Sequence, residues 1–206
     1  MYSALIQPFN VMIHPIQKTT ELKENKNYSI LLAILIVFLF FMSDVIEYQY
    51  TSRNFNFNKP FTLNVFYVSI RTIFVYFLFV LSNWCVTTLM EGKGTFTEIF
   101  VFSSYSIVPI ILTSISATLI SYFVTQEEAV FMMWIKNIGV IWSAILFLIT
   151  LMTIHQYSLF RTLISLLLTA FGMLVMVFLI ILFFSLMQQM FSFFQTLYYE
   201  LYYRIV

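Results

Sequence analysis

The sequence predicts an all-α, polytopic integral membrane protein: a bundle of five transmembrane helices with a short N-terminal interfacial helix and an aromatic C-terminal helical tail. Of its 206 residues, 61% are hydrophobic, 20% aromatic and 9% charged, whereas about 25% of the residues in an ordinary soluble domain are charged. The chain contains five apolar runs near the length of about 20 residues that a bilayer span needs. Charged residues stand at the ends of these runs, as expected because a charge at the bilayer centre costs roughly 2.5 to 3.5 kcal/mol.

Residues 1–27 are expected to form a cytoplasmic segment on the membrane surface. Between Leu5 and Ile16 the apolar residues recur at steps of three and four, which gives one face of a helix too short to span a bilayer. The segment is polar and mixed in charge, unlike a secretory signal peptide. We expect the helix to anchor on lipid headgroups, with docking of a cytoplasmic partner as the alternative. Its apolar face consists of Leu5, Phe9, Met12, Ile13 and Ile16.

Charged residues mark the boundaries of the predicted spans. The first apolar run stops at Asp44, Arg71 precedes the second, and Lys136 precedes the fourth. We expect no Asp or Glu inside these runs, which argues against proton coupling. The predicted spans cover residues 28–46, 72–90, 99–124, 137–154 and 162–187.

The third span is unusually rich in hydroxyl side chains. Thr113, Ala117 and Ser121 repeat at intervals of four, which lines small side chains along one face and lets neighbouring backbones approach closely. Gly139 and Ser143 give the fourth span a similar notch. We therefore expect the third span at the centre of the bundle. A polar conduit for a substrate is the alternative, but hydroxyls without an ionisable residue at mid-depth favour helix packing.

Residues 188–206 continue the fifth span in helical composition but are rich in tyrosine, which collects at the headgroup level of a membrane. Because residues 162–206 are far longer than one crossing, we expect this tail to leave the bilayer or to turn along its surface. A partner-binding helix is the alternative. The tyrosines of the tail are Tyr198, Tyr199, Tyr202 and Tyr203.

Basic residues indicate an orientation, because they are enriched in cytoplasmic loops. With five spans, one side holds Lys18, Lys23, Lys26, Lys93 and Arg161. The other side holds Arg53, Lys59, Arg71, Lys136 and Arg204. The tie of five against five becomes five against three if Arg71 and Lys136 lie in the membrane. We therefore predict a cytoplasmic N-terminus and a C-terminus on the opposite side.

The residues that catalysis or cofactor binding would need are sparse. Lys93 follows a glycine, but Gly94 stands where a phosphate-binding loop has a hydroxyl. His14 and His155 have no Cys or carboxylate beside them at metal-ligand spacing. We expect no catalytic, cofactor-binding or metal site. The net charge of +1 argues against a nucleic-acid partner.

The segment that begins at Gly92 predicts a tight turn before the third span. Gly92 and Gly94 are expected to supply unusual backbone angles, with Lys93 held at the headgroups. Thr95 is the predicted N-cap, and Glu98, three residues later, completes a capping box.

The chain also resembles the Yip-domain family, the Ypt/Rab-interacting membrane proteins. The resemblance rests on Pro15, Glu21, Leu22 and Lys23, on the turn Gly92, Lys93, Gly94, Thr95 and Phe96, and on "YSIVP" from Tyr105 to Pro109. It implies five spans, a cytoplasmic N-terminus and no enzymatic activity. Eukaryotic members sit in secretory-pathway membranes and associate with prenylated small GTPases and with one another. We expect neither the family's long N-terminal cytoplasmic domain nor its "DLYGP" element in this chain, which argues against a small GTPase as partner.

The bias toward Phe, Ile, Asn and Lys makes the chain similar to compact bacterial members of the family, which implies the plasma membrane of a bacterium, or a secretory-pathway membrane if the source is eukaryotic.

Two functions follow as hypotheses. The first hypothesis is a non-enzymatic scaffold or accessory subunit that associates with other integral membrane proteins, such as a transporter complex, or with itself. The alternative is a small permease, with Arg71 and Lys136 flanking a polar path along the third span.

Overall fold

A computed structural model of the chain describes residues 6–56 and 63–205, and the regular elements within these ranges are all helices. Five helical segments are long and apolar enough to cross a membrane, which confirms the predicted class: Ile30–Tyr50, Val65–Leu89, Phe96–Ile120, Gln126–His155 and Leu159–Arg204. In chain order the helices are α2 (Gln7–Ile13), α3 (Pro15–Glu24), α4 (Ile30–Tyr50), α5 (Val65–Ser69), the π-helical η1 (Ile70–Phe74), α6 (Val75–Leu89), α7 (Phe96–Ile120), the 3-10 helix η2 (Gln126–Glu128), α8 (Ala129–His155) and α9 (Leu159–Ile205).

Three of these helices extend beyond the charges that mark the predicted boundaries. α4 continues past Asp44 to Tyr50, so its acidic residues lie inside the helix. The segment from Val65 to Leu89 encloses Arg71, and α8 encloses Lys136. The hydropathy pattern breaks at each charge, but a charge that is paired with one on a neighbouring helix does not end a helix. The opposite difference occurs in α7, which ends at Ile120 rather than at residue 124.

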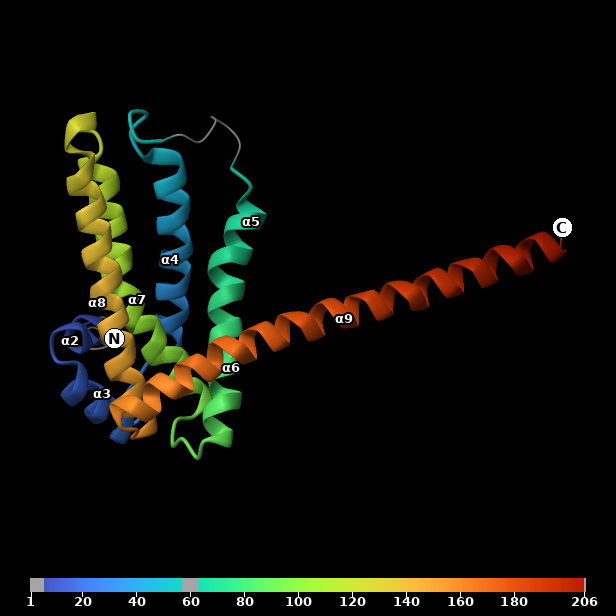
Figure 1. The fold of residues 1–206 in the computed structure, drawn as a ribbon, viewed down its shortest axis with the longest axis horizontal. Coiled ribbons are helices and arrows are strands. Elements are labelled where there is room, and N and C mark those ends of the chain that lie inside the picture. The colour runs from blue at the N-terminus through green and yellow to red at the C-terminus, as the bar shows by residue number, and fades with distance from the viewer. Residues whose placement is uncertain (1–5, 57–62, 206) are drawn as a thin grey trace.

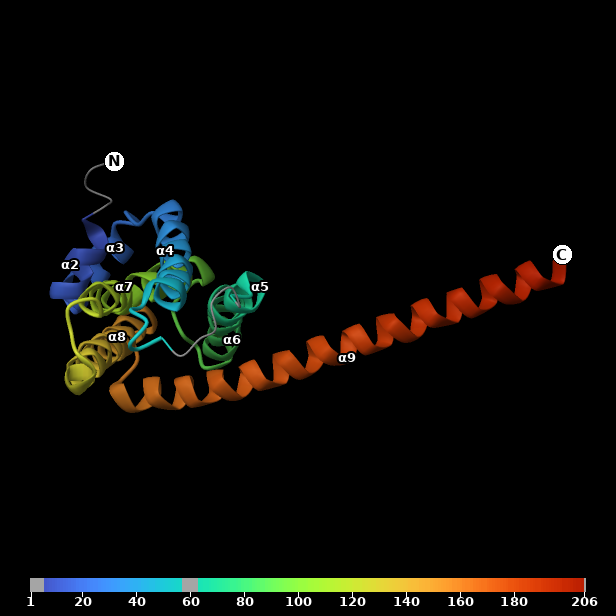
Figure 2. The same ribbon diagram turned by 90° about the horizontal axis from the view of Figure 1, so that it is seen from above.

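α7 occupies the centre of the bundle, as expected from its small and hydroxyl side chains. It packs against α4 and α8 along most of its length and against α2 and α6 over shorter stretches, and Figure 2 shows it enclosed by α2, α4 and α8. Within its most apolar stretch 72% of the residues are buried inside the chain, compared with 33% for α4. Its innermost side chains include Ile99, Phe102 and Tyr105, all fully buried.

The hydroxyl groups of α7 bond mainly to their own helix. Ser106 Oγ donates to the carbonyl of Phe102 at 3.0 Å, and Thr118 Oγ1 donates to that of Ser114 at 2.9 Å. Hydroxyls that bond to carbonyls one turn earlier are satisfied without a substrate or a water chain. This pattern supports the expectation of helix packing over that of a polar conduit.

Close contact between α7 and α8 depends on Gly139. A Cβ atom at this position would lie 1.9 Å from Thr113 Oγ1 and 2.8 Å from Thr113 Cβ, so only glycine fits here without displacing the facing helix. Ser143, one turn further along α8, is also buried. The other end of the α7 stripe faces a different neighbour, since Ser121 Oγ accepts a hydrogen bond from the Ser52 amide at 2.8 Å.

The N-terminal helices α2 and α3 lie against the bundle and still present an apolar face outward. Val11, Thr19 and Leu22 are buried, and α2 contacts α7 while α3 contacts α8. Ile13 and Ile16 are 65% and 61% exposed. The predicted apolar face is therefore on the surface over Phe9, Ile13 and Ile16, and Met12 is half-buried beside it. Leu5 lies outside the described residues.

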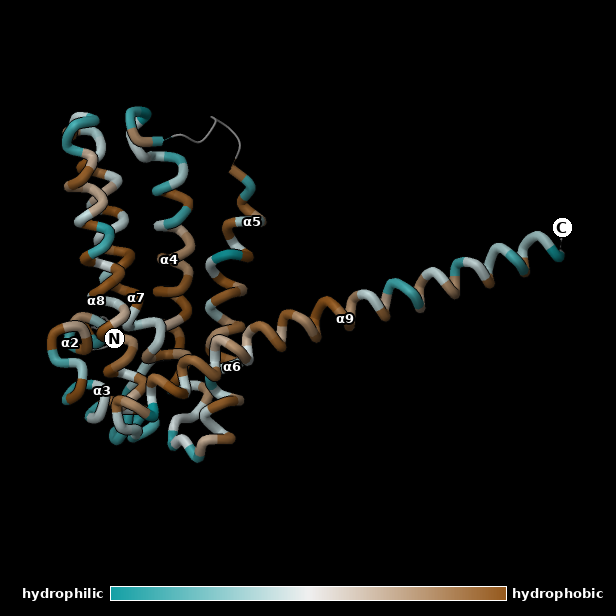
Figure 3. Tube along the Cα trace, in the orientation of Figure 1, coloured by the Kyte–Doolittle hydropathy of each residue, from teal (hydrophilic) through white to brown (hydrophobic). Residues whose placement is uncertain are grey.

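α9 is the most unusual element. It is one continuous helix of 47 residues, roughly 70 Å long at 1.5 Å per residue, and it leaves the bundle sideways after crossing α6 (Figure 1). No break in the helix separates residues 162–187 from the tail beyond them. Figure 3 shows apolar residues dominating its first part and polar residues becoming frequent toward the C-terminus. Only 6% of its most apolar stretch is buried inside the chain.

Replacement of Gly139 by alanine tests the close contact between α7 and α8. In a free helix this change stabilises by up to about 1 kcal/mol, but here we expect a loss of about 1–3 kcal/mol because the new methyl group collides with Thr113. Thermal unfolding in detergent micelles measures the difference. Val140→Leu is the matched control, since Val140 is exposed. A Gly139→Ala variant as stable as the parent protein would contradict the contact, and Thr113→Ala should restore part of the loss.

Candidate functional site

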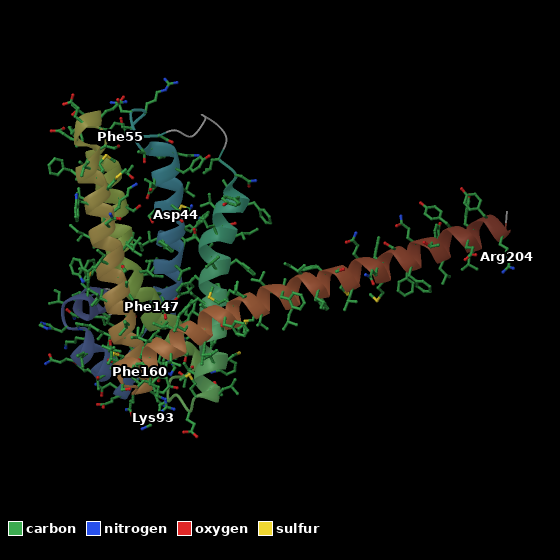
Figure 4. The ribbon with its side chains drawn as sticks, viewed as in Figure 1. Asp44, Phe55, Lys93, Phe147, Phe160 and Arg204 are labelled. Carbon is green, nitrogen blue, oxygen red and sulfur yellow. The ribbon has the colours of Figure 1, made fainter. Side chains whose placement is uncertain are left out.

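The predicted turn lies at the end of the bundle where the N-terminal helices and the start of α9 also lie (Figure 4, near Lys93 and Phe160). We call this region the corner and define it by residues 91–98 and 154–161. A Cβ atom at Gly94 would lie 2.5 Å from Ile154 Cγ2 and 2.6 Å from His155 Cε1. One at Gly92 would lie 2.6 Å from His155 Nδ1. The two glycines are therefore sites of close approach between the α6–α7 turn and the end of α8.

The expectation that these glycines supply unusual backbone angles is wrong. Among the described residues no glycine has a positive φ angle, whereas Glu91 has a φ of 59°. Gln156, which follows α8, has a φ of 56° and caps that helix in the left-handed conformation. Non-glycine residues thus make the two sharp turns, and the glycines provide the space in which the turns meet.

The predicted capping box at the start of α7 is confirmed. Glu98 N–H donates to Thr95 Oγ1 at 3.3 Å, and Thr95 N–H donates to Glu98 Oε2 at 3.0 Å. The same carboxylate oxygen lies 3.7 Å from Lys23 Nζ, which also donates to the carbonyl of Ile154. Lys23 therefore links α3 to the beginning of α7 and to the end of α8.

His155 is a packing residue of the corner. Its side chain is buried, its Nδ1 accepts a hydrogen bond from the Gly94 amide at 3.3 Å, and its ring stacks on that of Tyr157. An accepting Nδ1 fixes the tautomer in which Nε2 carries the proton. No group of three or more His, Cys, Asp or Glu side chains that could hold a metal occurs among residues 6–56 and 63–205.

Tyr157 and Arg161 fasten the start of α9 to the end of α6. The hydroxyl of Tyr157 donates to the carbonyls of Thr87 and Met90, at 3.3 Å and 3.1 Å. Burial raises the pKa of Tyr157, so this hydroxyl keeps its proton at neutral pH and remains a donor. Arg161 donates to the same Met90 carbonyl and lies 4.6 Å from the centre of the Tyr157 ring. Lys93 makes one exposed contact, donating to Gln156 Oε1 at 2.7 Å.

Two other motif residues lie inside α7, away from the corner. Tyr105 is fully buried, and its hydroxyl donates to Gln7 Oε1 at 3.2 Å, which joins α7 to α2. Pro109 is buried within α7, and the helix continues through it. Thr113 Oγ1 donates to the Pro109 carbonyl at 2.9 Å, one turn earlier in the same helix.

A second site, which we call the charged cluster, lies toward the opposite end of the bundle and consists of Asp44, Glu47, Arg71 and Lys136. Arg71 Nη2 lies 3.0 Å from Asp44 Oδ2, and Lys136 Nζ lies 2.7 Å from Glu47 Oε1. Thr72 Oγ1 donates to the same oxygen of Asp44 at 2.5 Å. The pairs join α4 to η1 and to α8, and Figure 4 places Asp44 on α4 at this level of the bundle.

The charged cluster corrects the expectation that no Asp or Glu lies inside a spanning helix. Asp44 and Glu47 are three residues apart on α4, so they share one face of it, and each is neutralised by a basic residue of a neighbouring helix. A paired charge is far less costly in a membrane than an isolated one. Arg71 and Lys136, which the sequence places only at span boundaries, are thereby brought to one place. The three-residue spacing of Asp44 and Glu47 was the sequence pattern that could have indicated this shared charged site.

A polar seam between α6 and α9 was also not predicted from the sequence. Ser82 Oγ donates to the Thr169 carbonyl at 2.8 Å, and Asn83 Nδ2 donates to Thr169 Oγ1 at 3.0 Å. A Cβ atom at Gly172 would lie 2.5 Å from Ser82 Oγ. On α9 the buried positions of the seam are Thr162, Ser165 and Thr169. Small residues at intervals of four indicated packing in the third span, and a search of α9 for small residues at steps of three and four would have found this seam.

The tyrosines of the tail are exposed at the far end of α9. Tyr198 and Tyr202, one turn apart, stack with ring centres 6.4 Å from each other. All four tyrosines expose half or more of their side chains. The structure thus brings them to neither the corner nor the charged cluster.

The geometry of the corner gives different expectations for its neighbouring residues. Gly94→Val should lower the thermal stability of the protein in detergent clearly, by about 1–3 kcal/mol, because the added side chain collides with Ile154 and His155. Lys93→Ala should change it by less than about 1 kcal/mol, because it removes one exposed hydrogen bond. Equal tolerance of both substitutions would show that the corner has no strict geometry.

Comparison with known proteins agrees with this architecture. A protein-family model described as the Yip1 domain matches residues 9–181, which include all but the first two residues of the N-terminal helices, the corner, the charged cluster and the packed part of α9. Searches of curated proteins and of solved structures gave no match. The match covers most of the chain and confirms the family resemblance that the motifs carry. The chain therefore belongs to the Yip1 domain family of multi-pass membrane proteins.

Proposed function

We propose that this protein is a non-enzymatic membrane scaffold or accessory subunit that binds another integral membrane protein through α9. The observation that carries the proposal is the contrast between α9 and the other spanning helices. Only 6% of the most apolar stretch of α9 is buried within the chain, whereas 33% or more is buried in each of the other four. The part of this long helix beyond its contacts with α6 has almost no intramolecular packing and offers a continuous surface to a partner.

The attachment of α9 supports this role. Tyr157, two residues before α9, and Arg161 in its first turn hold its start against α6. The polar seam at Ser82, Asn83 and Thr169 holds the turns that follow. Beyond Gly172 no residue of α9 is buried among those whose side chains the structure describes. Hydrogen bonds between helices contribute about 0.6 kcal/mol each on average in a membrane, so the seam fixes the base of α9 and leaves the remainder available.

The distribution of basic residues supports a cytoplasmic N-terminus, with the plasma membrane of a bacterium as the proposed location and a secretory-pathway membrane as the alternative. Lys23, Lys93 and Arg161 all belong to the end of the bundle that holds the corner. Arg71 and Lys136 are neutralised by acidic partners and so carry little weight in the positive-inside rule. A reporter fused at Lys93 tests this orientation, and periplasmic activity there would contradict it.

A permease is the second candidate, and the charged cluster is the observation that favours it. The cluster lines a pocket of about 370 Å³, so Arg71 and Lys136, the residues expected to flank a path, share one cavity. The self-bonded hydroxyls of α7 weigh against a continuous polar route. Solute flux into liposomes that is lost in Arg71→Ala would support a permease, and the absence of flux for every solute class tried would count against it.

Photo-crosslinking in the native membrane tests the scaffold role. Benzoylphenylalanine in place of Phe178, which is 62% exposed on α9, should give one defined protein adduct that mass spectrometry identifies. Phe131 on α8, 66% exposed, is the matched control and should react mainly with lipid. An adduct containing a second copy of the chain would indicate self-association, and one containing another membrane protein an accessory role. If Phe178 reacts only with lipid, as Phe131 does, the proposal fails.

A further inference from the structure

The charged cluster opens into an apolar pocket beside it. The first pocket, of about 370 Å³, contains the four charged side chains. The second, of about 480 Å³, is lined by Ala129, Met132 and Met133. Thr51, Phe55 and Lys136 line both pockets. Together they form a cleft, which we call the amphipathic cleft, that is charged at one end and apolar at the other.

The charged end of the cleft still has N–H donors and carboxylate oxygens that can make further hydrogen bonds. Arg71 uses Nη2 alone on Asp44, and its other N–H groups have no hydrogen-bond partner among residues 6–56 and 63–205. Its side chain is 61% exposed. Each oxygen of Glu47 has one partner, Lys136 on Oε1 and Ser114 on Oε2, whereas a carboxylate oxygen accepts two.

All four residues of the cluster lie within seven residues of an end of their helices, and Glu47, three residues before the end of α4, lies nearest to one. Asp44 is six residues before the end of α4, and Arg71 is six residues after Val65. At 1.5 Å per residue each lies about 9 Å inside its helix end. Lys136, seven residues into α8, lies at about 10 Å. The polar layers of a bilayer occupy roughly 5–8 Å on each side, so we expect groups at this distance from the helix ends to lie near the boundary between headgroups and hydrocarbon.

The π-helical turn η1 adds to this arrangement. Arg71 and Thr72 are adjacent in the sequence and both donate to Asp44 Oδ2. π-Helical turns inside α-helices are rare and occur frequently at functional sites. The turn therefore holds the carboxylate in place while the guanidinium group reaches the pocket.

We propose that the amphipathic cleft binds one phospholipid with a zwitterionic headgroup that carries a primary ammonium, as in phosphatidylethanolamine. The cluster has two acidic and two basic residues, so a headgroup of a single sign meets repulsion as well as attraction, whereas a zwitterion finds a partner for each charge. Arg71 and Lys136 bind the phosphate. Asp44 and Glu47 accept the ammonium hydrogens, which a choline headgroup lacks. An acyl chain lies along Met132 and Met133.

Lipid binding to the full-length protein in detergent tests this proposal. Native mass spectrometry and thermal unfolding are measured with phosphatidylethanolamine, phosphatidylcholine, phosphatidylglycerol or free phosphoethanolamine of matched concentration. We expect retention and stabilisation by phosphatidylethanolamine that exceed those by the other two lipids at least several-fold. Free phosphoethanolamine should have little effect, because it leaves the apolar pocket empty. Equal responses to the three lipids, or an equal response to the free headgroup, would overturn the proposal.

Three variants locate the binding. Arg71→Gln should weaken phosphatidylethanolamine binding about tenfold or more, as expected for the loss of a charged hydrogen bond. Arg53→Gln is the matched control, since Arg53 is exposed near the same end and lines neither pocket, and it should bind as the parent does. Ala129→Phe fills the apolar pocket without replacing a charged residue and should weaken binding several-fold, so the test stands even if Arg71→Gln fails to fold. Unchanged binding in Ala129→Phe would contradict the site.

Discussion

The close packing of α7 against its neighbours is the constraint on which the rest of the bundle depends. Lipid tails are as apolar as leucine, so burial of apolar side chains gives no hydrophobic drive for helices to associate inside a bilayer. Association then depends on close van der Waals contact and on polar contacts between helices. Gly139 allows the first by leaving room for Thr113, and Glu47 supplies the second by accepting hydrogen bonds from Ser114 and Lys136.

The charged and polar residues therefore act as connections between helices. Asp44 and Glu47 tie α4 to η1 and α8, Lys23 ties α3 to α7 and α8, and Ser82 ties α6 to α9. Each connection lies near a helix end or along a seam of small residues. The same distribution leaves most of α9 without contacts, which explains how one chain combines a well-packed bundle with an exposed helix.

Much of the fold could be predicted from the sequence because apolar runs of bilayer length have one stable solution in lipid. The capping box at Thr95 and the central place of the third span followed from local patterns, and both are observed. The helix ends near Asp44, Arg71 and Lys136 could not be predicted in this way, because hydropathy treats each charge as isolated and the pairing is a property of the folded state. The sequence indicated that Gly94 is needed for an unusual backbone angle. The structure shows instead that it lies against Ile154 and His155, which are about 60 residues away in the sequence and so could not be identified from a local pattern.

We propose that another protein covers the exposed face of α9 in the native membrane. Leu174 is 70% exposed on α9 and lies just beyond the polar seam. A spin label at Leu174→Cys, in a Cys85→Ser background, reports its accessibility to lipid-soluble oxygen in purified protein in nanodiscs and in native membranes. We expect high accessibility in nanodiscs and clear protection in native membranes. Equal, high accessibility in both would show that α9 faces only lipid and would contradict the proposal.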